Sequence, residues 1–159
     1  MFRRKPTMEE LEELRSIADL QFYGVGEKLI PEDIVVVLSP STYRIRYILL
    51  NNEIYLTLRA SDHRFLLHIR AATRLNKILP HPLMRVYVNP KYSIYISEGG
   101  NVFAKHVVIA DPEIRPGDEV LVLDYNTKEL LGVGKAVKPG WCIPYHSWGE
   151  AVRLRESTR

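Results

Sequence analysis

Residues suited to binding a polyanion are concentrated around a glycine pair in the stretch "EGGNVFAKHVV". Gly99 and Gly100 are followed by Asn101, Phe103 and Lys105. Glycine can adopt positive φ and leaves its backbone N–H accessible, so a phosphate or a base can approach closely. Lysine suits a phosphate, and asparagine can read a base or ribose edge. The pattern predicts a nucleic-acid contact, although a helix C-cap that uses one glycine is an alternative explanation.

A second group of cations lies on a segment with helical periodicity. Arg70, Arg74 and Lys77 fall at i, i+4 and i+7, opposite an apolar side, so they share one helix face. Such a stripe suits a run of phosphates, because Lys and Arg neutralise backbone charge without reading sequence. A solvated helix face explains it equally well. Arg44 and Arg46 alternate along "RIRYI", so they share one face of a strand and can act together.

The last apolar run, "EAVRLRES", alternates between apolar and charged residues. Val152 and Leu154 are expected to point inward, so Arg153 and Arg155 point outward. Solvated surface arginines would explain this pattern without a ligand. The ring of Phe103 has two interpretations as well, because it can stack on an unpaired base or belong to the core.

Catalytic and metal chemistry find little support in the sequence. No nucleophile and base stand at a spacing that would support catalysis. Cys142, the single cysteine, and His146 could supply two metal ligands, but a structural zinc site needs four. The segment "GVGE" from Gly24 to Glu27 lacks the third glycine of a dinucleotide-binding loop and follows a helix instead of a strand. We therefore expect no enzymatic activity, no cofactor and no metal.

The composition is that of a globular protein with an uneven charge distribution. The 159 residues are 46% hydrophobic, which is enough to bury a core. No apolar stretch approaches the roughly 20 residues that span a bilayer, and no apolar signal region follows "MFRRKPTMEE", so we expect a cytoplasmic protein without membrane contact. Eight basic and two acidic residues lie from Arg44 to Arg85, whereas six acidic and two basic residues lie from Asp111 to Glu129. This asymmetry suggests a polyanion partner or an uneven solvated surface.

The first half of the chain alternates helical and strand-like segments. "TMEELEELRSIADL" predicts a helix with Thr7 as N-cap and Glu10 completing a capping box. "IVVVLS", "RIRYILL" and "EIYLTLRA" predict strands, with a hairpin turn at Asn51-Asn52. Helical periodicity returns from His68 to Leu79 and ends at "LPHPLM". These segments define an α+β domain over residues 7–82.

The second half consists mainly of short strands. A strand at "MRVYV" and a short helix from Pro90 to Ser97 precede strand-like runs at "VFAKHVVIA", "DEVLVLD", "LLGVGKAV" and "EAVRLRE". Many short strands with turns between them predict a small closed or nearly closed β-barrel, because closure hides strand edges. This domain is expected over residues 83–157.

Both halves resemble known domains. Residues 85–156 resemble a PUA domain, an RNA-binding β pseudobarrel, in "EGGNVFAKHVV", "RPGDEVLVLD", "LLGVGKAV" and the closing "GEAVRLRE". Upstream, "ADLQFYGVGEKLIPEDIVVVLSPSTYRIRYI" and "RLNKILPHPLMRVYV" resemble the patch-forming domain that precedes the PUA domain in archaeal tRNA-guanine transglycosylases of archaeosine synthesis. The resemblance implies an α+β patch-forming domain followed by a PUA-type pseudobarrel.

The resemblance also implies a function. In those enzymes a catalytic (β/α)₈ barrel of about 250 residues precedes the two domains, whereas only the tail "MFRRKP" precedes them in this sequence. The resemblance therefore implies a non-catalytic protein that binds the acceptor stem and 3′ end of tRNA, alone or as the subunit of a separate transglycosylase-type catalytic chain. A PUA-type translation or ribosome-associated factor is the alternative. The residues expected to bind RNA are Gly99, Gly100, Asn101, Phe103, Ala104, Lys105, Arg153, Arg155, Arg70, Arg74, Lys77, Arg44 and Arg46.

Overall fold

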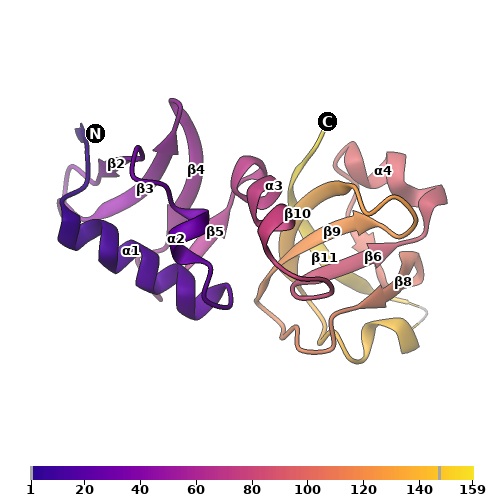
Figure 1. Cartoon of the computed structure of the whole chain (residues 1–159). Coiled ribbons are helices and arrows are strands. Elements are labelled where there is room, and N and C mark those ends of the chain that lie inside the picture. Colours follow the sequence, from indigo (N-terminus) through magenta and orange to yellow (C-terminus); the bar gives the residue numbers. More distant parts are fainter. Residues whose placement is uncertain (1, 147) are drawn as a thin grey trace. The chain divides into compact units, whose positions relative to one another are not determined.

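The computed structural model describes residues 2–146 and 148–159, which form two compact units (Figure 1). The first unit ends at Leu79, and the second runs from Pro80 to Arg159. The domain limits expected from the sequence, 7–82 and 83–157, remain a prediction. Among the described residues, no helix combines the length and the hydrophobicity needed to cross a membrane.

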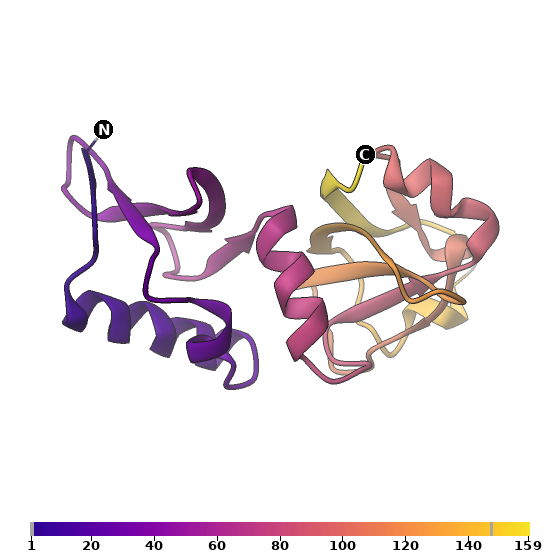
Figure 2. The same ribbon diagram turned by 45° about the horizontal axis from the view of Figure 1, so that its top comes forward.

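The first unit is an antiparallel sheet accompanied by three helices, and α1 runs beside the sheet in Figure 2. Its five strands follow one another in the order β1-β2-β3-β4-β5. The strands are β1 (Phe2–Arg4), β2 (Val35–Leu38), β3 (Ile45–Leu50), β4 (Glu53–Leu58) and β5 (Phe65–Leu67). The helices are α1 (Met8–Gln21), α2 (Gly26–Leu29) and α3 (Ile69–Ile78).

The start of α1 confirms the predicted capping box. The Thr7 hydroxyl accepts from the Glu10 N–H at 3.1 Å, and the Glu10 carboxylate accepts from the Thr7 N–H at 2.9 Å. Arg4 also donates to Glu10, at 2.7 and 2.8 Å, and this interaction is the main reason why the pKa of Glu10 falls to about 2. Within the segment that precedes the first domain in the sequence, Phe2–Arg4 forms β1 and pairs with β2; Met1 lies outside the described residues.

Three hairpins share one loop conformation. In the six-residue segments 39–44, 59–64 and 124–129, the N–H of the first residue donates to the carbonyl of the sixth at 2.8, 2.9 and 3.0 Å, respectively. The N–H of the fifth residue donates to the carbonyl of the first residue at 2.8, 3.1 and 2.9 Å, respectively. The fifth residue has positive φ in each loop: Tyr43, His63 and Lys128. The shorter turn between β3 and β4 is the predicted Asn51-Asn52 hairpin, with φ of 53° and 63°.

The second unit is a sheet that curls into a nearly closed barrel. Its six strands have the order β7-β11-β10-β9-β6-β8, with one parallel pair, β6 and β9. The strands are β6 (Arg85–Val88), β7 (Val102–Phe103), β8 (Val107–Ala110), β9 (Glu119–Asp124), β10 (Leu130–Ala136) and β11 (Glu150–Ser157). The edge strands β7 and β8 are consecutive in the chain and separated by the short helix η2 (Ala104–His106), so the two edges come close together.

The core and the remaining helices of this unit match the predicted pattern. A short helix follows β6 as expected, formed by η1 (Pro90–Tyr92) and α4 (Ser93–Ser97), and η3 (Ile143–Tyr145) precedes β11. Valine side chains from β6, β9 and β11 fill the barrel. The prediction of one strand over "VFAKHVVIA" is wrong, because η2 interrupts it. The buried His106 ring accepts from the Phe103 N–H at 3.2 Å and stabilises this turn.

Candidate nucleic-acid interface

The glycine pair forms the C-terminal cap of α4. Gly99 has φ of +105°, as predicted, and its N–H donates to the Ile96 carbonyl at 2.9 Å. The Gly100 N–H donates to the Tyr95 carbonyl at 3.0 Å. These two bonds form a Schellman motif, which satisfies the last carbonyls of the helix. The expectation that both N–H groups are exposed for a phosphate is therefore wrong.

Gly100 is required by packing and not by its backbone conformation. It is absent from the positive-φ residues among the described positions, so the expected positive φ is wrong. A Cβ at Gly100 would lie 2.3 Å from Cζ of Tyr95, whose ring covers this position. The second glycine of the pair is thus explained by the aromatic ring of the helix that the pair caps.

The glycine turn lies beside the closing strand, as the PUA resemblance implied. Asn101 Oδ1 accepts from the Leu154 N–H at 3.0 Å, which ties the turn to β11. In the ladder between β7 and β11, Val102 pairs with Val152 and both are fully buried. Phe103 is 37% exposed, so its side chain lies at the surface and is available to a partner.

Ala104 and Lys105 differ in what they can offer to a ligand. Ala104 is buried, and its N–H donates to the Gly149 carbonyl at 2.8 Å. Lys105 is exposed in η2, next to Phe103. Burial lowers the pKa of His106, and the charge of Lys105 lowers it further. Lys105 is therefore the residue of this turn best suited to a phosphate.

The two arginines of β11 have different environments. Arg153 is 70% exposed and donates to the Glu150 carboxylate at 3.1 Å. Arg155 forms a bidentate salt bridge with Glu119 of β9, and the Glu119 side chain is only 4% exposed. The predicted inward position of Val152 is confirmed, and Leu154 is partly buried against the same core. Asn101, Phe103, Lys105 and Arg153 thus share the β7–β11 edge, whereas the guanidinium of Arg155 is bound to a buried carboxylate.

The basic stripe of the first unit lies on α3, and its apolar side is buried as predicted. Arg70 pairs with Glu53 at 2.9 Å, and Arg74 and Lys77 are exposed. These three cations therefore lie on one accessible helix face.

Arg85 does not belong to the basic surface that the charge count suggested. It is fully buried, and its Nη1 donates to the carbonyls of Pro80 and Leu83 at 2.9 and 3.0 Å. Burial lowers its pKa. The sequence count therefore overstated the exposed positive charge, because local pattern does not reveal that a cation is enclosed.

Arg44 and Arg46 line a cavity, together with Arg59 and His63, which the sequence analysis did not select. The last two come from the loop before β5, a three-residue strand that the sequence did not predict. Arg59 and His63 could have been recognised from the sequence, because the segments "SPSTYR" and "RASDHR" have the same length and each joins two strands.

Cys142 and His146, the two residues that could have supplied metal ligands, have other contacts. The Cys142 thiol donates to the Pro139 carbonyl at 3.3 Å, and His146 Nδ1 lies 3.2 Å from Lys138 Nζ. Within residues 2–146 and 148–159, no group of three or more potential ligands is placed to hold a metal ion.

Comparison with known proteins identifies both units. Residues 12–82 match the patch-forming domain C2 of tRNA-guanine transglycosylase, and residues 84–156 match the PUA domain. The chain is 36% identical over 151 residues to the tRNA-guanine(15) transglycosylase of Methanothermobacter thermautotrophicus, covering 94% of this chain and 23% of that protein. The enzyme of Pyrococcus furiosus is 39% identical over 153 residues, covering 95% and 26%.

The chain thus spans about a quarter of the length of the curated relatives that it matches. A solved structure of a hypothetical protein from Pyrococcus horikoshii OT3 superposes with a TM-score of 0.76. The superposition covers 99% of this chain and 95% of the Pyrococcus protein at 20% sequence identity, so the similarity shows the fold alone.

Proposed function

We propose that this chain, built of a patch-forming C2 domain followed by a PUA domain, binds tRNA and does not itself catalyse base exchange. The observation that carries the proposal is the pair of adjoining matches, which stand in the order found in archaeal tRNA-guanine(15) transglycosylases and together reach from residue 12 to residue 156. The protein would hold tRNA in the cytoplasm for a transglycosylase-type catalytic chain, as its partner or as part of it.

The PUA unit supplies the contact for the acceptor stem and 3′ end in this proposal. Lys105 offers a charge for a phosphate, and the exposed ring of Phe103 offers a surface on which an unpaired base can stack. Arg153 adds a second cation, since its surface pair with Glu150 is weak enough to exchange for a phosphate. Gly99 and Gly100 contribute by shaping the turn, because their N–H groups are used by the helix cap.

The first unit supplies sequence-independent contacts to the phosphate backbone. Arg70, Arg74 and Lys77 lie on one face of α3 and can follow successive phosphates. Neither unit is a (β/α)₈ barrel, the fold that performs the transglycosylase chemistry according to the family resemblance, which supports a binding role for both.

The decisive experiment measures tRNA affinity against salt concentration for the wild type and for Lys105→Ala. Removing one phosphate contact should weaken binding several-fold for all tRNA sequences and reduce the slope of log K against log salt by about one. Lys28→Ala is the matched control, because Lys28 is an exposed lysine of α2 outside the predicted interface.

Three outcomes would contradict the proposal: no binding of bulk tRNA at low salt, affinity that does not depend on salt, or base exchange by the purified chain alone. Preference for ribosomal RNA over tRNA would favour a ribosome-associated factor instead.

A further inference from the structure

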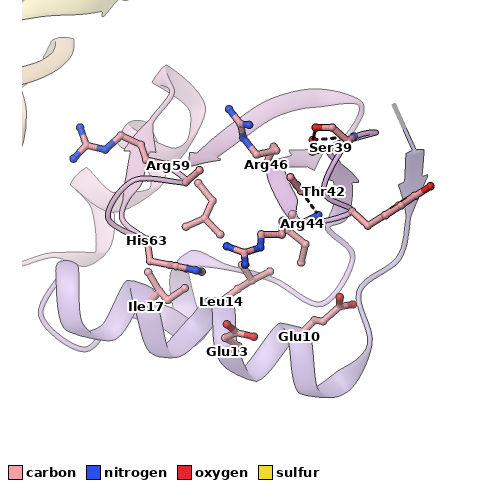
Figure 3. Close-up of a pocket in the computed structure, with 15 residues that line it drawn as sticks. Glu10, Glu13, Leu14, Ile17, Ser39, Thr42, Arg44, Arg46, Arg59 and His63 are labelled. Atoms are coloured by element: carbon pink, nitrogen blue, oxygen red, sulfur yellow. Dashed lines mark hydrogen bonds between the residues drawn. The ribbon is translucent and has the colours of Figure 1, made fainter.

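The first unit contains a cavity of about 390 Å³ at one end of its sheet. Because β2 to β5 are antiparallel neighbours, the loops 39–44 and 59–64 lie at this same end. The cavity is bounded by these two loops, by β3 and by α1 (Figure 3). Its volume falls near the lower end of the about 300–1,000 Å³ typical of small-molecule sites. It is large enough for a single mononucleotide.

The two loops have a defined backbone and carry cationic side chains. The Ser39 N–H donates to the Arg44 carbonyl, and the Arg59 N–H donates to the Arg64 carbonyl, so each loop is closed by backbone bonds. Arg44 and His63 point toward one another above α1, whereas Arg46 points away from α1 at the opposite rim (Figure 3). A group bound between the loops would therefore meet donors from two sides.

Two of these cations are not neutralised within the described part of the chain. The guanidinium groups of Arg44 and Arg46 form no ion pair or hydrogen bond with any residue among 2–146 and 148–159, and Arg46 Nε is buried without a partner. Arg59, in contrast, is paired with Asp62. Arg44 is exposed and Arg46 is partly buried. A guanidinium without a counter-charge favours an anion, above all a phosphate that it can bind with two bonds.

The floor of the cavity, on the α1 side below Arg44 and His63, is suited to an uncharged group (Figure 3). Leu14 and Ile17 of α1 form an apolar floor, and Tyr43 at the mouth is exposed and stacked on Phe2 with ring centroids 5.8 Å apart. Glu13 of α1 also lines the cavity (Figure 3). Its carboxylate would repel a phosphate and could accept a hydrogen bond from the N–H of a base. The cavity therefore combines cationic side chains with an apolar floor beneath them.

We propose that this cavity binds one unpaired nucleotide through its 5′-phosphate, with the phosphate at Arg44 and the base over Leu14 and Ile17. The inference deepens the proposed function, on which it rests for the source of the ligand: a nucleotide of bound RNA. A free mononucleotide has the same chemistry, and the experiment separates the two sources.

The test titrates the full chain with AMP, CMP, GMP and UMP, and separately with adenosine and with inorganic phosphate, by calorimetry. Monophosphates should bind, and adenosine should bind about tenfold more weakly, since a charge-assisted hydrogen bond contributes on this scale. Arg44→Ala should lose about tenfold in affinity for the monophosphates. Arg115→Ala, which removes an exposed arginine of the second unit, should bind them like the wild type.

A second variant separates the base from the phosphate. Ile17→Phe enlarges a half-buried side chain on the apolar floor without changing the charge. It should weaken binding of monophosphates and leave the binding of inorganic phosphate unchanged. A 5′-phosphorylated trinucleotide that binds more tightly than a monophosphate would identify RNA as the source, and equal or weaker binding would identify the free nucleotide.

Failure of this inference and failure of the proposed function give different results. If monophosphates do not bind, or if Arg44→Ala and Arg115→Ala bind them equally, the cavity inference is wrong, whatever tRNA does. If monophosphates bind as described but tRNA does not bind at any salt concentration, the cavity inference holds and the proposed function is wrong.

Discussion

The pair formed by Arg155 and Glu119 should contribute more to folding than any surface cation of the PUA unit. The Glu119 side chain is 4% exposed and that of Arg155 is 27% exposed, so the pair is largely shielded from water. Arg155→Ala would leave the carboxylate of Glu119 buried without its main counter-charge. Removing one partner of a buried pair costs about 3–5 kcal/mol, and partial access of water places this case near about 3 kcal/mol.

The loss can be measured as a melting temperature. For a unit of this size a loss of 1 kcal/mol lowers the melting temperature by about 4–8 °C, so Arg155→Ala should lower it by roughly 12–24 °C. Both tryptophans, Trp141 and Trp148, are largely exposed, at 64% and 75%, so calorimetry is a better measurement of this transition than their fluorescence.

Arg153→Ala is the matched control, because it removes an arginine from the same strand. Arg153 is 70% exposed, and an exposed pair contributes at most about 1 kcal/mol. Replacing both members of the buried pair, with Arg155→Met and Glu119→Leu, should recover most of the loss, since an apolar pair leaves no charge buried. Equal decreases in melting temperature for Arg155→Ala and Arg153→Ala would refute this reasoning.

Two further predictions concern the glycine turn and the first helix. Gly100→Ala should destabilise the second unit by about 1–3 kcal/mol, because the new methyl group overlaps the Tyr95 ring. Adding Tyr95→Ala to this variant should restore stability. Tyr95→Ala should not rescue Gly99→Ala, because that variant is destabilised by the positive φ at residue 99. Because Arg4 lowers the folded-state pKa of Glu10 from 4.5 to about 2, this carboxylate stabilises the first unit above pH 4.5, and the contribution is lost as the pH falls toward 2. Hydrogen exchange of α1 should show on the order of 1 kcal/mol of this loss in the wild type and none in Glu10→Gln.

Elements with a long periodic signal could be predicted from the sequence. The capping box at Thr7, the hairpin at Asn51-Asn52 and the burial of one side of α3 depend on neighbouring residues, so local pattern was sufficient. The three-residue strands β1 and β5 were missed, because so short a run has no recognisable period. Their pairing partners β2 and β4 determine them instead.

The candidate site was harder to predict, because its chemistry depends on contacts distant in sequence. The expected role of Gly100 failed for a local reason, since its N–H caps α4 and the Tyr95 ring five residues earlier occupies the space above it. Arg59 and His63 were missed because only the folded sheet brings their loop to the same end as Arg44. Residue type indicated which side chains could bind an anion, but not which of them were already engaged.

The arginines of this protein therefore differ in whether an incoming phosphate can use them. Arg70 pairs with the exposed Glu53, and the exposed Arg153 pairs with the partly exposed Glu150. Such surface pairs contribute at most about 1 kcal/mol, so a phosphate can replace the carboxylate at little cost. Arg155 cannot make this exchange cheaply, because its departure would leave Glu119 buried and charged. Arg85 is enclosed by backbone carbonyls and is not accessible at all. It follows that loss of RNA binding in an Arg155 variant would report on folding, whereas the same loss in an Arg70 or Arg153 variant would report on contact with RNA.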